Sequence, residues 1–168
     1  CDSPNFGPRP ATDVSLVVVH SISLPPGRYG GDAVERLFTN RLDFDAHPYY
    51  ARLRDLRVSA HFLIRRDGER VQFVSTADRA WRDNCNDWSI GVELEGIEGG
   101  AFEPAQYRSL VTLLRALQRR HPIAEVVGHE HVAPGRKADP GPGFDWGALR
   151  RRLAAARPAL PLPLVAAA

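Results

Sequence analysis

The stretch from Gly128 to Trp146, GHEHVAPGRKADPGPGFDW, gathers residue types that do chemistry. It contains two histidines, and its many proline and glycine residues favour a rigid loop rather than a helix or a strand. A rigid loop can direct the imidazole of His129 and the carboxylate of Asp139 to one point. Because Zn²⁺ binds neutral imidazole and carboxylate in mixed sets, the stretch predicts a metal site.

Lys137 lies in the same loop and is the only lysine of the sequence, which otherwise carries its positive charge on arginine. A bias toward arginine does not explain why the exception falls two residues before Asp139. A compact ammonium group can reach a single oxygen atom where a planar guanidinium cannot. We therefore expect Lys137 to act in the site, and the alternative is a solvated loop residue.

Two apolar runs are expected to deliver the histidines to the site. Residues 15–19 form a valine-rich run that ends at His20, and residues 126–127 form a shorter run that leads to His129. Such runs are typical of strands buried on both faces, and ligands of open α/β sheets bind beyond the carboxyl ends of strands. His20 is therefore a candidate ligand, and the alternative is a core or capping histidine.

A third strand is expected over residues 87–96, DWSIGVELEG. Alternation places an apolar set on one face and a set with two glutamates on the other: Ile90, Val92 and Leu94 against Gly91, Glu93 and Glu95. In a sheet covered on both faces, a carboxylate among small residues needs a partner or a chemical role. Glu93 is therefore a candidate catalytic group, with a solvent-facing strand glutamate as the alternative, and solvent is the expected environment of Glu95.

His20, His129 and Asp139 together leave a four-coordinate zinc ion one open position, which is the arrangement of catalytic rather than structural sites. Such an ion lowers the pKa of water and polarises a carbonyl oxygen. Glu93 would then take a proton from water, and Lys137 would face the developing oxyanion. These groups are the parts of an amide hydrolase.

The other elements are expected to form the scaffold. Residues 1–13 read as a proline-rich surface segment, and residues 41–48 as irregular. The patterns predict a short helix after Asp32, a helical turn or two over 49–56, a hairpin of 58–64 and 70–74 around Asp67-Gly68, and helices from Pro104 to His121 and from Trp146 to Ala156. His61 lies inside the first hairpin strand, so we expect it to be buried or to support a ligand.

The chain of 168 residues, 43% of them hydrophobic, is long enough for one domain with a core and too short for two. We expect residues 1–157 to form that domain and residues 158–168, rich in Pro, Leu and Ala, to be a flexible tail. A net charge of +2 without a long basic run gives no indication of nucleic-acid binding. No apolar run approaches a membrane span, and two cysteines fit a reducing compartment.

Four ordered blocks carry a family resemblance: VVVHSISLPPGRYGG, RVSAHFLIRRDG, CNDWSIGVELEG and GHEHVAPGRKADPGPGFDW. From about Ser3 to Trp146 the chain resembles the AmpD family of zinc-dependent N-acetylmuramoyl-L-alanine amidases. The resemblance implies an α/β fold in a single domain, with a mixed central β-sheet flanked by helices, as in peptidoglycan recognition proteins. It also implies cleavage of the lactyl-amide bond between muramic acid and L-alanine, on 1,6-anhydro-muropeptides from cell-wall recycling in the cytoplasmic members.

By matching motif positions, the resemblance implies one zinc ion per chain on His20, His129 and Asp139, with Glu93 and Lys137 as the catalytic glutamate and lysine. Further residues are expected to support the site or to bind substrate: His61, Arg57, Trp81 and Arg136. We expect a cytoplasmic monomer that acts on muropeptides and has neither a nucleic-acid nor a membrane partner.

The chain departs from the family pattern at several places. Ser21 stands where the family usually has Asn, and Glu130-His131 stand where it has Cys-Asp. His131 is a rival imidazole, but we expect it to turn away because the family fills its position with a non-ligand. The family carries about ten further residues after the equivalent of Trp81, in a surface region that varies freely. Either the substrate loop is short here or a segment is missing from the sequence shown.

Other functions fit parts of the pattern. A non-catalytic peptidoglycan-binding domain could share the fold, but the complete set of ligands with Glu93 and Lys137 argues against it. The chain lacks methionine, so we expect a processed or trimmed product, and Cys1 is compatible with an exported or lipid-anchored autolysin. A structural zinc protein is disfavoured because the sequence offers no convincing fourth ligand.

Overall fold

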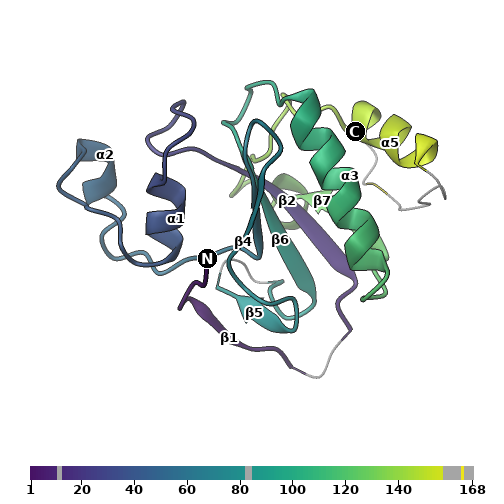
Figure 1. The fold of residues 1–168 in the computed structure, drawn as a ribbon, viewed down its shortest axis with the longest axis horizontal. Coiled ribbons are helices and arrows are strands. Elements are labelled where there is room, and N and C mark those ends of the chain that lie inside the picture. The colour runs from purple at the N-terminus through teal and green to yellow at the C-terminus, as the bar shows by residue number, and fades with distance from the viewer. Residues whose placement is uncertain (11–12, 82–84, 157–163, 165–168) are drawn as a thin grey trace.

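The computed structural model describes residues 1–10, 13–81, 85–156 and 164. Its elements in chain order are β1 (Phe6–Pro8), β2 (Leu16–Ile22), α1 (Ala33–Phe38), α2 (Pro48–Ala51), β3 (Phe62–Ile64), β4 (Arg70–Gln72), β5 (Asp78–Ala80), β6 (Ser89–Glu95), α3 (Pro104–Gln118), β7 (Glu125–Gly128), α4 (His129–Val132) and α5 (Trp146–Ala155). Figure 1 shows the sheet at the centre, with α3 and α5 at one end and α1 and α2 at the other.

A five-stranded sheet in the order β4-β3-β6-β2-β7 forms the centre of the fold. β6 and β7 both pair with β2 in parallel, β3 pairs with β6 in parallel, and β4 is antiparallel to β3. β6 is buried along its whole length and β2 is buried in its middle, Val17 to His20, because helices or loops cover both faces of the sheet. The predicted single α/β domain with a mixed central sheet is confirmed.

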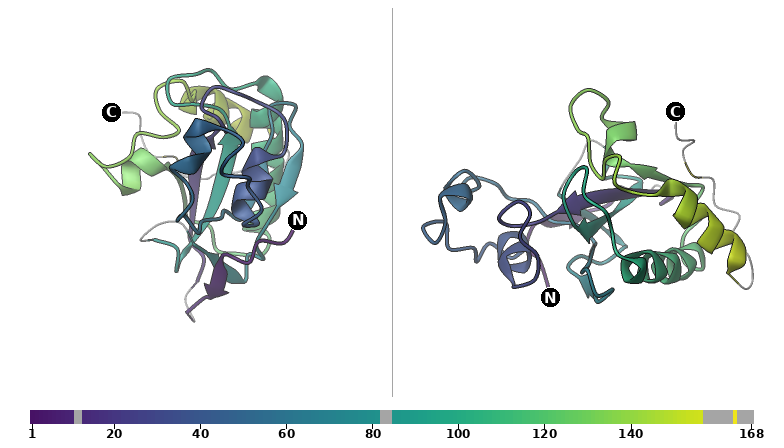
Figure 2. Two further views of the ribbon diagram at one scale, coloured as in Figure 1. Left: turned by 90° about the vertical axis from the view of Figure 1, so that its left-hand side faces the viewer. Right: turned by 90° about the horizontal axis from the view of Figure 1, so that it is seen from above.

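The two faces of the sheet carry different layers. On one face, α3 and α5 bury the largest apolar cluster against the strands. On the other face, α1 packs around Leu63 of β3 in a second cluster. Figure 2 shows α4 on the side of the sheet opposite α3 when the molecule is viewed from above. The sheet is thus the middle layer of three.

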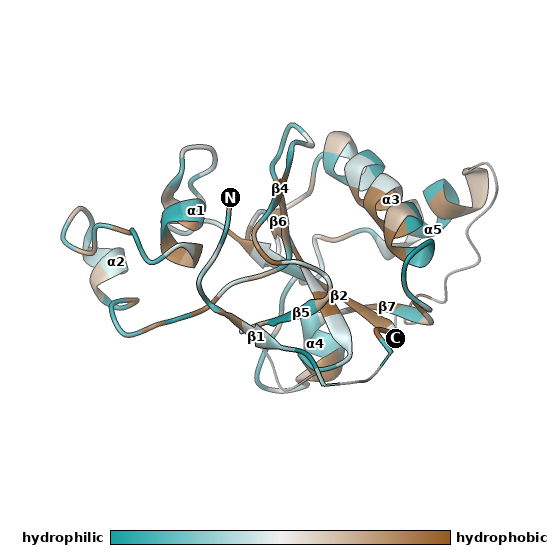
Figure 3. Ribbon diagram, turned by 60° about the horizontal axis from the view of Figure 1, so that its bottom comes forward, coloured by the Kyte–Doolittle hydropathy of each residue, from teal (hydrophilic) through white to brown (hydrophobic). Residues whose placement is uncertain are grey.

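The long helix α3 illustrates how sequence signals become structure. Pro104 is at its first turn, and Glu103 and Gln106 form a capping box that satisfies free backbone N–H groups. Its buried positions recur with helical spacing: Gln106, Tyr107, Leu110, Leu113, Leu114 and Leu117. Figure 3 accordingly shows brown and teal stretches along α3. The helix ends at Gln118, three residues before the predicted end at His121.

The shorter elements differ more from expectation. The hairpin strands are confirmed but span only 62–64 and 70–72. The predicted surface segment 1–13 contains β1, which pairs with β5 in a separate antiparallel sheet of two strands. The helix expected within 49–56 begins one residue earlier, at Pro48. His47 caps it, because its ring accepts a hydrogen bond from the backbone N–H of Tyr49 at 3.0 Å.

The C-terminal helix is confirmed, with Asp145 as its cap: the Asp145 carboxylate accepts a hydrogen bond from the backbone N–H of Ala148 at 2.7 Å. The predicted flexible tail, 158–168, lies outside the described residues except for Leu164. Leu164 forms an isolated parallel bridge with Val126 of β7 and packs against the main apolar cluster. Within the described ranges, no helix is long and apolar enough to cross a membrane.

Candidate active site

Two parallel strands bring His20 and His129 together. β2 and β7 are in register up to Val19 opposite Gly128, so His20 and His129 both follow at the carboxyl edge of the sheet. The two rings lie 4.4 Å apart between centroids in an edge-to-face arrangement. Both histidines are buried, at 0% and 4% exposure. The expected strand end at His20 is wrong, because β2 continues to Ile22; the two imidazoles meet because β2 and β7 pair in register up to Val19 and Gly128.

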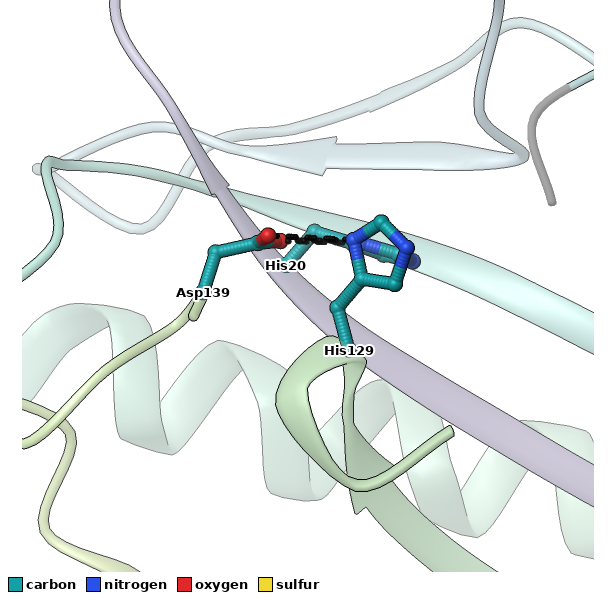
Figure 4. Close-up of side chains that lie close together, drawn as sticks. All are labelled: His20, His129 and Asp139. Atoms are coloured by element: carbon teal, nitrogen blue, oxygen red, sulfur yellow. Dashed lines mark hydrogen bonds and ion pairs between the residues drawn. The ribbon is translucent and has the colours of Figure 1, made fainter. Parts of the chain in front are cut away.

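Asp139 completes the cluster from the loop that follows α4. Its carboxylate lies 3.1 Å from Nδ1 of His20 and 3.0 Å from Nδ1 of His129 (Figure 4). The loop returns to the site because the backbone N–H of Glu130 donates to the carbonyl oxygen of Asp139 at 3.0 Å. Gly135 and Gly141 have positive φ angles there, which glycine adopts without strain.

One part of the loop prediction is wrong. His129 begins a helical turn, α4, rather than an irregular loop. Gly128 precedes it with an extended backbone, and the backbone N–H of Ala133 donates to the carbonyl oxygen of His129 at 3.0 Å. The turn folds the chain back toward the sheet, which is how a residue ten positions later reaches the same point.

The electrostatics of the cluster favour an ionised carboxylate. Burial opposes the charge on Asp139, but hydrogen bonds from His129 and His20 outweigh it and hold the pKa of this carboxyl well below its usual range. A carboxylate binds a cation only in its ionised form. Asp139 is therefore in the state that a metal ligand requires at neutral pH.

The types and spacing of the three side chains match the ligand preferences of zinc. Their donor atoms lie within 4.8 Å of one another, and within the described residues they are the one group of this kind. Tetrahedral zinc with bonds near 2.0–2.1 Å needs donors roughly 3.3 Å apart, so small shifts would suffice. Two neutral nitrogens and one carboxylate oxygen also leave one coordination position open to a substrate or water.

Glu93 lies beside this cluster. In the parallel pairing of β2 with β6, Glu93 is opposite His20, so the two side chains project from the same face of the sheet. Glu93 is fully buried, at 0% exposure, which rules out the solvent-facing alternative. It lines a cleft of about 760 Å³ together with His129, Lys137 and Asp139.

Lys137 contributes to the same cleft from the exposed part of the loop. Its backbone N–H donates to the carbonyl oxygen of Ala133 at 3.1 Å, which anchors the residue to the end of α4. Glu93 and Lys137 thus line one cleft, Glu93 from a central strand and Lys137 from a surface loop. The structure brings both residues to one cleft, and their catalytic roles stay predictions.

His131 lies outside the metal group of the described residues. Its Nδ1 accepts a hydrogen bond from the backbone N–H of Gly128 at 2.9 Å, and its ring packs edge-on against Trp146 at 5.6 Å. Both contacts hold the ring away from His129. The rival imidazole therefore has a structural partner of its own.

The four remaining candidates lie farther from the cluster. His61 is buried one residue before β3, and its Nδ1 accepts a hydrogen bond from the backbone N–H of Gly91 at 3.1 Å, so it braces β6 two residues before Glu93. This agrees with a supporting role. The other three, Arg57, Trp81 and Arg136, are exposed and do not line the cleft formed by the described residues.

Sequence reasoning missed the apolar wall of the cleft. Residues of α1, α2 and the segments around them form it: Leu24, Leu37, Phe38, Tyr49, Leu53, Leu56 and Val58. The periodic apolar residues of 34–38 signalled a buried helix face, but no local signal shows that this face also borders a site. The expectation for Glu95 is wrong as well, because its side chain is only 6% exposed.

Comparisons with known proteins agree with this geometry. Residues 10–142 match the family described as N-acetylmuramoyl-L-alanine amidase. The chain is 49% identical over 160 residues to the 1,6-anhydro-N-acetylmuramyl-L-alanine amidase AmpD of Citrobacter freundii, covering 88% of this chain and 86% of that protein.

Solved structures give the same result. A selenomethionine derivative of AmpD superposes with a TM-score of 0.86 at 50% identity, covering 90% of this chain and 91% of the other. Peptidoglycan recognition protein 1 of Manduca sexta, at 18% identity and a TM-score of 0.62 over 87% of this chain and 81% of the other, shares the fold alone. The chain therefore belongs to the AmpD family of N-acetylmuramoyl-L-alanine amidases.

Proposed function

We propose that the protein hydrolyses the amide bond between the lactyl group of 1,6-anhydro-N-acetylmuramic acid and L-alanine in muropeptides, with one zinc ion per chain. The convergence of His20, His129 and Asp139 beside the buried carboxylate of Glu93 carries this proposal. The name and activity of the AmpD relative from Citrobacter freundii, at 49% identity, support the choice of substrate.

The residues divide the chemistry of amide hydrolysis between them. His20, His129 and Asp139 would hold the metal, and a zinc ion bound there would supply Lewis acidity that polarises the amide carbonyl and acidifies water. Glu93 takes the proton of the attacking water and later passes it to the leaving amine. Lys137 faces the carbonyl oxygen, where negative charge develops in the transition state.

The position of Glu93 suits a general base. Glu93 stands beside the proposed metal cluster, within the cleft that would receive the attacking water. Its place on a central strand fixes the direction from which it acts, because a paired strand does not move independently. Lys137, in contrast, stands on a loop and is exposed, which lets it adjust to the substrate.

The chemistry of the rest of the cleft suits a substrate that has an apolar part. Its wall of leucine and aromatic side chains suits a sugar ring that has lost hydroxyl groups in the anhydro form. We infer that residues 1–157 form the amidase domain and that it works as a cytoplasmic monomer. Sedimentation of the purified chain and fractionation of its native host test these two inferences.

Defined muropeptides test the proposed reaction. The protein is incubated with anhydro-muropeptides and with their non-anhydro counterparts, with and without a chelator, and the products are identified by mass spectrometry. Release of free peptide that stops with chelator and returns with Zn²⁺ is the expected result. Binding without cleavage would instead identify a peptidoglycan-binding domain, and preference for intact cell wall would identify an autolysin.

A further inference from the structure

Glu95 is a buried acid that the reaction does not use. It follows Glu93 by two residues on β6, so both side chains project from the same face of the sheet. Glu95 is absent from the described residues that line the cleft, yet it is only 6% exposed. Because burying a carboxylate costs free energy unless hydrogen bonds compensate, its partners indicate what it does.

Each carboxylate oxygen of Glu95 has a different backbone partner. Oε1 accepts a hydrogen bond from the N–H of Gly30, and Oε2 accepts one from the N–H of Arg66 at 3.1 Å. Gly30 belongs to the loop of residues 23–31 that leaves β2, and Arg66 to the turn that leaves β3. Since β2 and β3 are the two neighbours of β6, one carboxylate joins the loops on both sides of its own strand.

The hairpin between β3 and β4 reinforces this connection through its two arginines. The guanidinium of Arg66 stacks on the ring of Tyr29 at 4.4 Å, and Nη1 of Arg65 donates to the carbonyl oxygen of Gly31 at 2.8 Å. All of these contacts converge on residues 29–31, the far end of the 23–31 loop. Its cleft end carries Ser23, whose hydroxyl accepts a hydrogen bond from the backbone N–H of Gly27 at 2.9 Å.

The 23–31 loop borders the catalytic cleft. Ser23, Leu24 and Pro26 line it, beside Glu93 and the metal cluster. Tyr50 of α2 donates its hydroxyl hydrogen to the carbonyl oxygen of Leu24 at 3.3 Å, so the loop is also joined to α2 within the apolar wall. A shift at the far end of the loop would therefore move residues that meet the substrate.

We propose that Glu95 is a positioning residue for substrate binding: by holding Gly30 and Arg66, it fixes the 23–31 loop as a wall of the cleft. This inference rests on the proposed amidase function. Glu95 does not touch the reacting groups, so its loss weakens the binding of substrate and transition state alike. Uniform loss of binding raises KM and leaves kcat unchanged, whereas loss of a catalytic group lowers kcat.

Glu95→Gln is the first test. The side-chain amide keeps one acceptor oxygen, but its NH2 group faces a backbone N–H and cannot accept from it. We expect KM to rise about fivefold to tenfold, the size of one lost hydrogen bond, with kcat within about twofold of the original. Zinc content should not change. Asp45→Asn is the control, because Asp45 is an exposed acid paired with Arg54, neither residue lines the cleft of the described residues, and both constants should stay unchanged.

Amide hydrogen exchange measured by NMR gives a readout that does not depend on activity. In the unaltered protein, the N–H groups of Gly30 and Arg66 should be protected. In Glu95→Gln, exchange of at least one of them should accelerate by about tenfold or more, because its acceptor is lost. Protection of both amides unchanged from the original protein would overturn the proposal, whatever the kinetics of the variant.

Tyr29→Ala loosens the same end of the loop by removing the ring under Arg66. Tyr29 is 42% exposed, so this variant should fold even where Glu95→Gln does not. A rise in KM without a fall in kcat is again expected. A fall in kcat that matches the fall in kcat/KM, or an unchanged KM in every folded variant, would overturn the positioning role. Failure of the unaltered protein to cleave muropeptides would instead reject the proposed function, and the exchange experiment would still decide the role of Glu95.

Discussion

The two faces of β2 and β6 are built from alternate residues of the same strands, yet they serve opposite purposes. One face carries apolar side chains that pack in the main cluster with α3 and α5, Val17, Val19, Ile90, Val92 and Leu94, with Ser21 as its polar member near the end of β2. The other face carries Val18 and Gly91 and then, toward the carboxyl edge, His20 beside Glu93. Apart from the half-buried Ser21, all of these residues are buried, so exposure does not distinguish the faces.

The difference shows how a buried site is tolerated. A buried ion costs several kcal/mol, whereas each fully buried Val, Leu or Ile side chain contributes about 1.5–3 kcal/mol. Because both sets share one backbone, the packing that stabilises the fold also fixes the direction of His20 and Glu93. Substitutions on the two faces should therefore affect different properties.

Asp139→Ala is expected to have the largest effect on the polar side. It removes one of three metal donors, so zinc content and amidase activity should both fall to background, as measured by metal analysis and peptide release. His131→Ala is the matched control, because His131 contacts Gly128 and Trp146 instead of the metal group. Loss of zinc in His131→Ala with retention in Asp139→Ala would show that the ligand set is wrong.

Glu93→Gln should separate activity from stability most clearly. We expect kcat to fall about a hundredfold or more, the effect of losing a general base, while zinc stays bound. The free energy of unfolding should not decrease, because the amide is neutral and has nearly the same shape. Steady-state kinetics, metal analysis and urea unfolding measure the three quantities. An equal loss of kcat in Glu95→Gln would reverse the assignment of roles on this strand.

Lys137 tests the loop contribution. Lys137→Ala should raise the activation free energy of the kcat step by on the order of 3 kcal/mol and so lower kcat. KM should change little, because the interaction forms mainly in the transition state. Lys137→Arg should restore little activity, since a planar guanidinium cannot occupy the same point. Kinetics of both variants at equal zinc content are decisive. Near-normal kcat in Lys137→Ala would leave this residue as a surface charge.

How far the sequence could predict this arrangement differs between the faces. The apolar face follows from alternation and helical spacing, so β2, β6, α3 and α5 were all expected. His20 and His129 were found because each follows an apolar run, although His20 lies inside β2, which continues to Ile22, and not at a strand end. Their meeting with Asp139 was also expected, because proline and glycine restrict the loop between His129 and Asp139.

What the sequence could not predict depends on contacts between distant segments. Alternation assigned Glu95 to a face but not to an environment, because its partners Gly30 and Arg66 are 65 and 29 residues away. The turn α4 has four residues, too few for a periodic pattern. The strand β1 pairs with a segment more than seventy positions later, which no local pattern reveals.

Leu114→Ala examines the apolar face. Leu114 is fully buried on α3 in the main cluster, so its truncation should lower the free energy of unfolding by about 2–5 kcal/mol. The kcat of the folded enzyme should not change at a temperature where the variant stays folded. Urea unfolding and kinetics of the same preparation measure both. Thr112→Ala, an exposed position of the same helix, is the control, and a kcat loss specific to Leu114→Ala would show that the faces are coupled.

The smallest effect is expected from His121, which lies past the end of α3 and away from the cleft. Burial and then the charges of Arg9 and Arg120 lower the pKa of His121, and its Nε2 lies 2.9 Å from the hydroxyl of Thr76. The unfolded chain therefore takes up this proton at higher pH than the folded one. The contribution of His121 to the free energy of unfolding is therefore complete at pH values above its unfolded-state pKa, near 6.5. It is lost as the pH falls through its folded-state pKa.

His121→Gln removes that titration and should flatten this part of the dependence of unfolding free energy on pH. Urea unfolding of both proteins between about pH 5 and pH 7.5 isolates the difference, because the two proteins differ at this residue alone. The ratio of their kcat values should stay constant over the same range, since His121 is absent from the cleft formed by the described residues. A ratio that changes with pH would show that protonation of His121 affects catalysis on the polar face. That result would contradict the independence of the two faces.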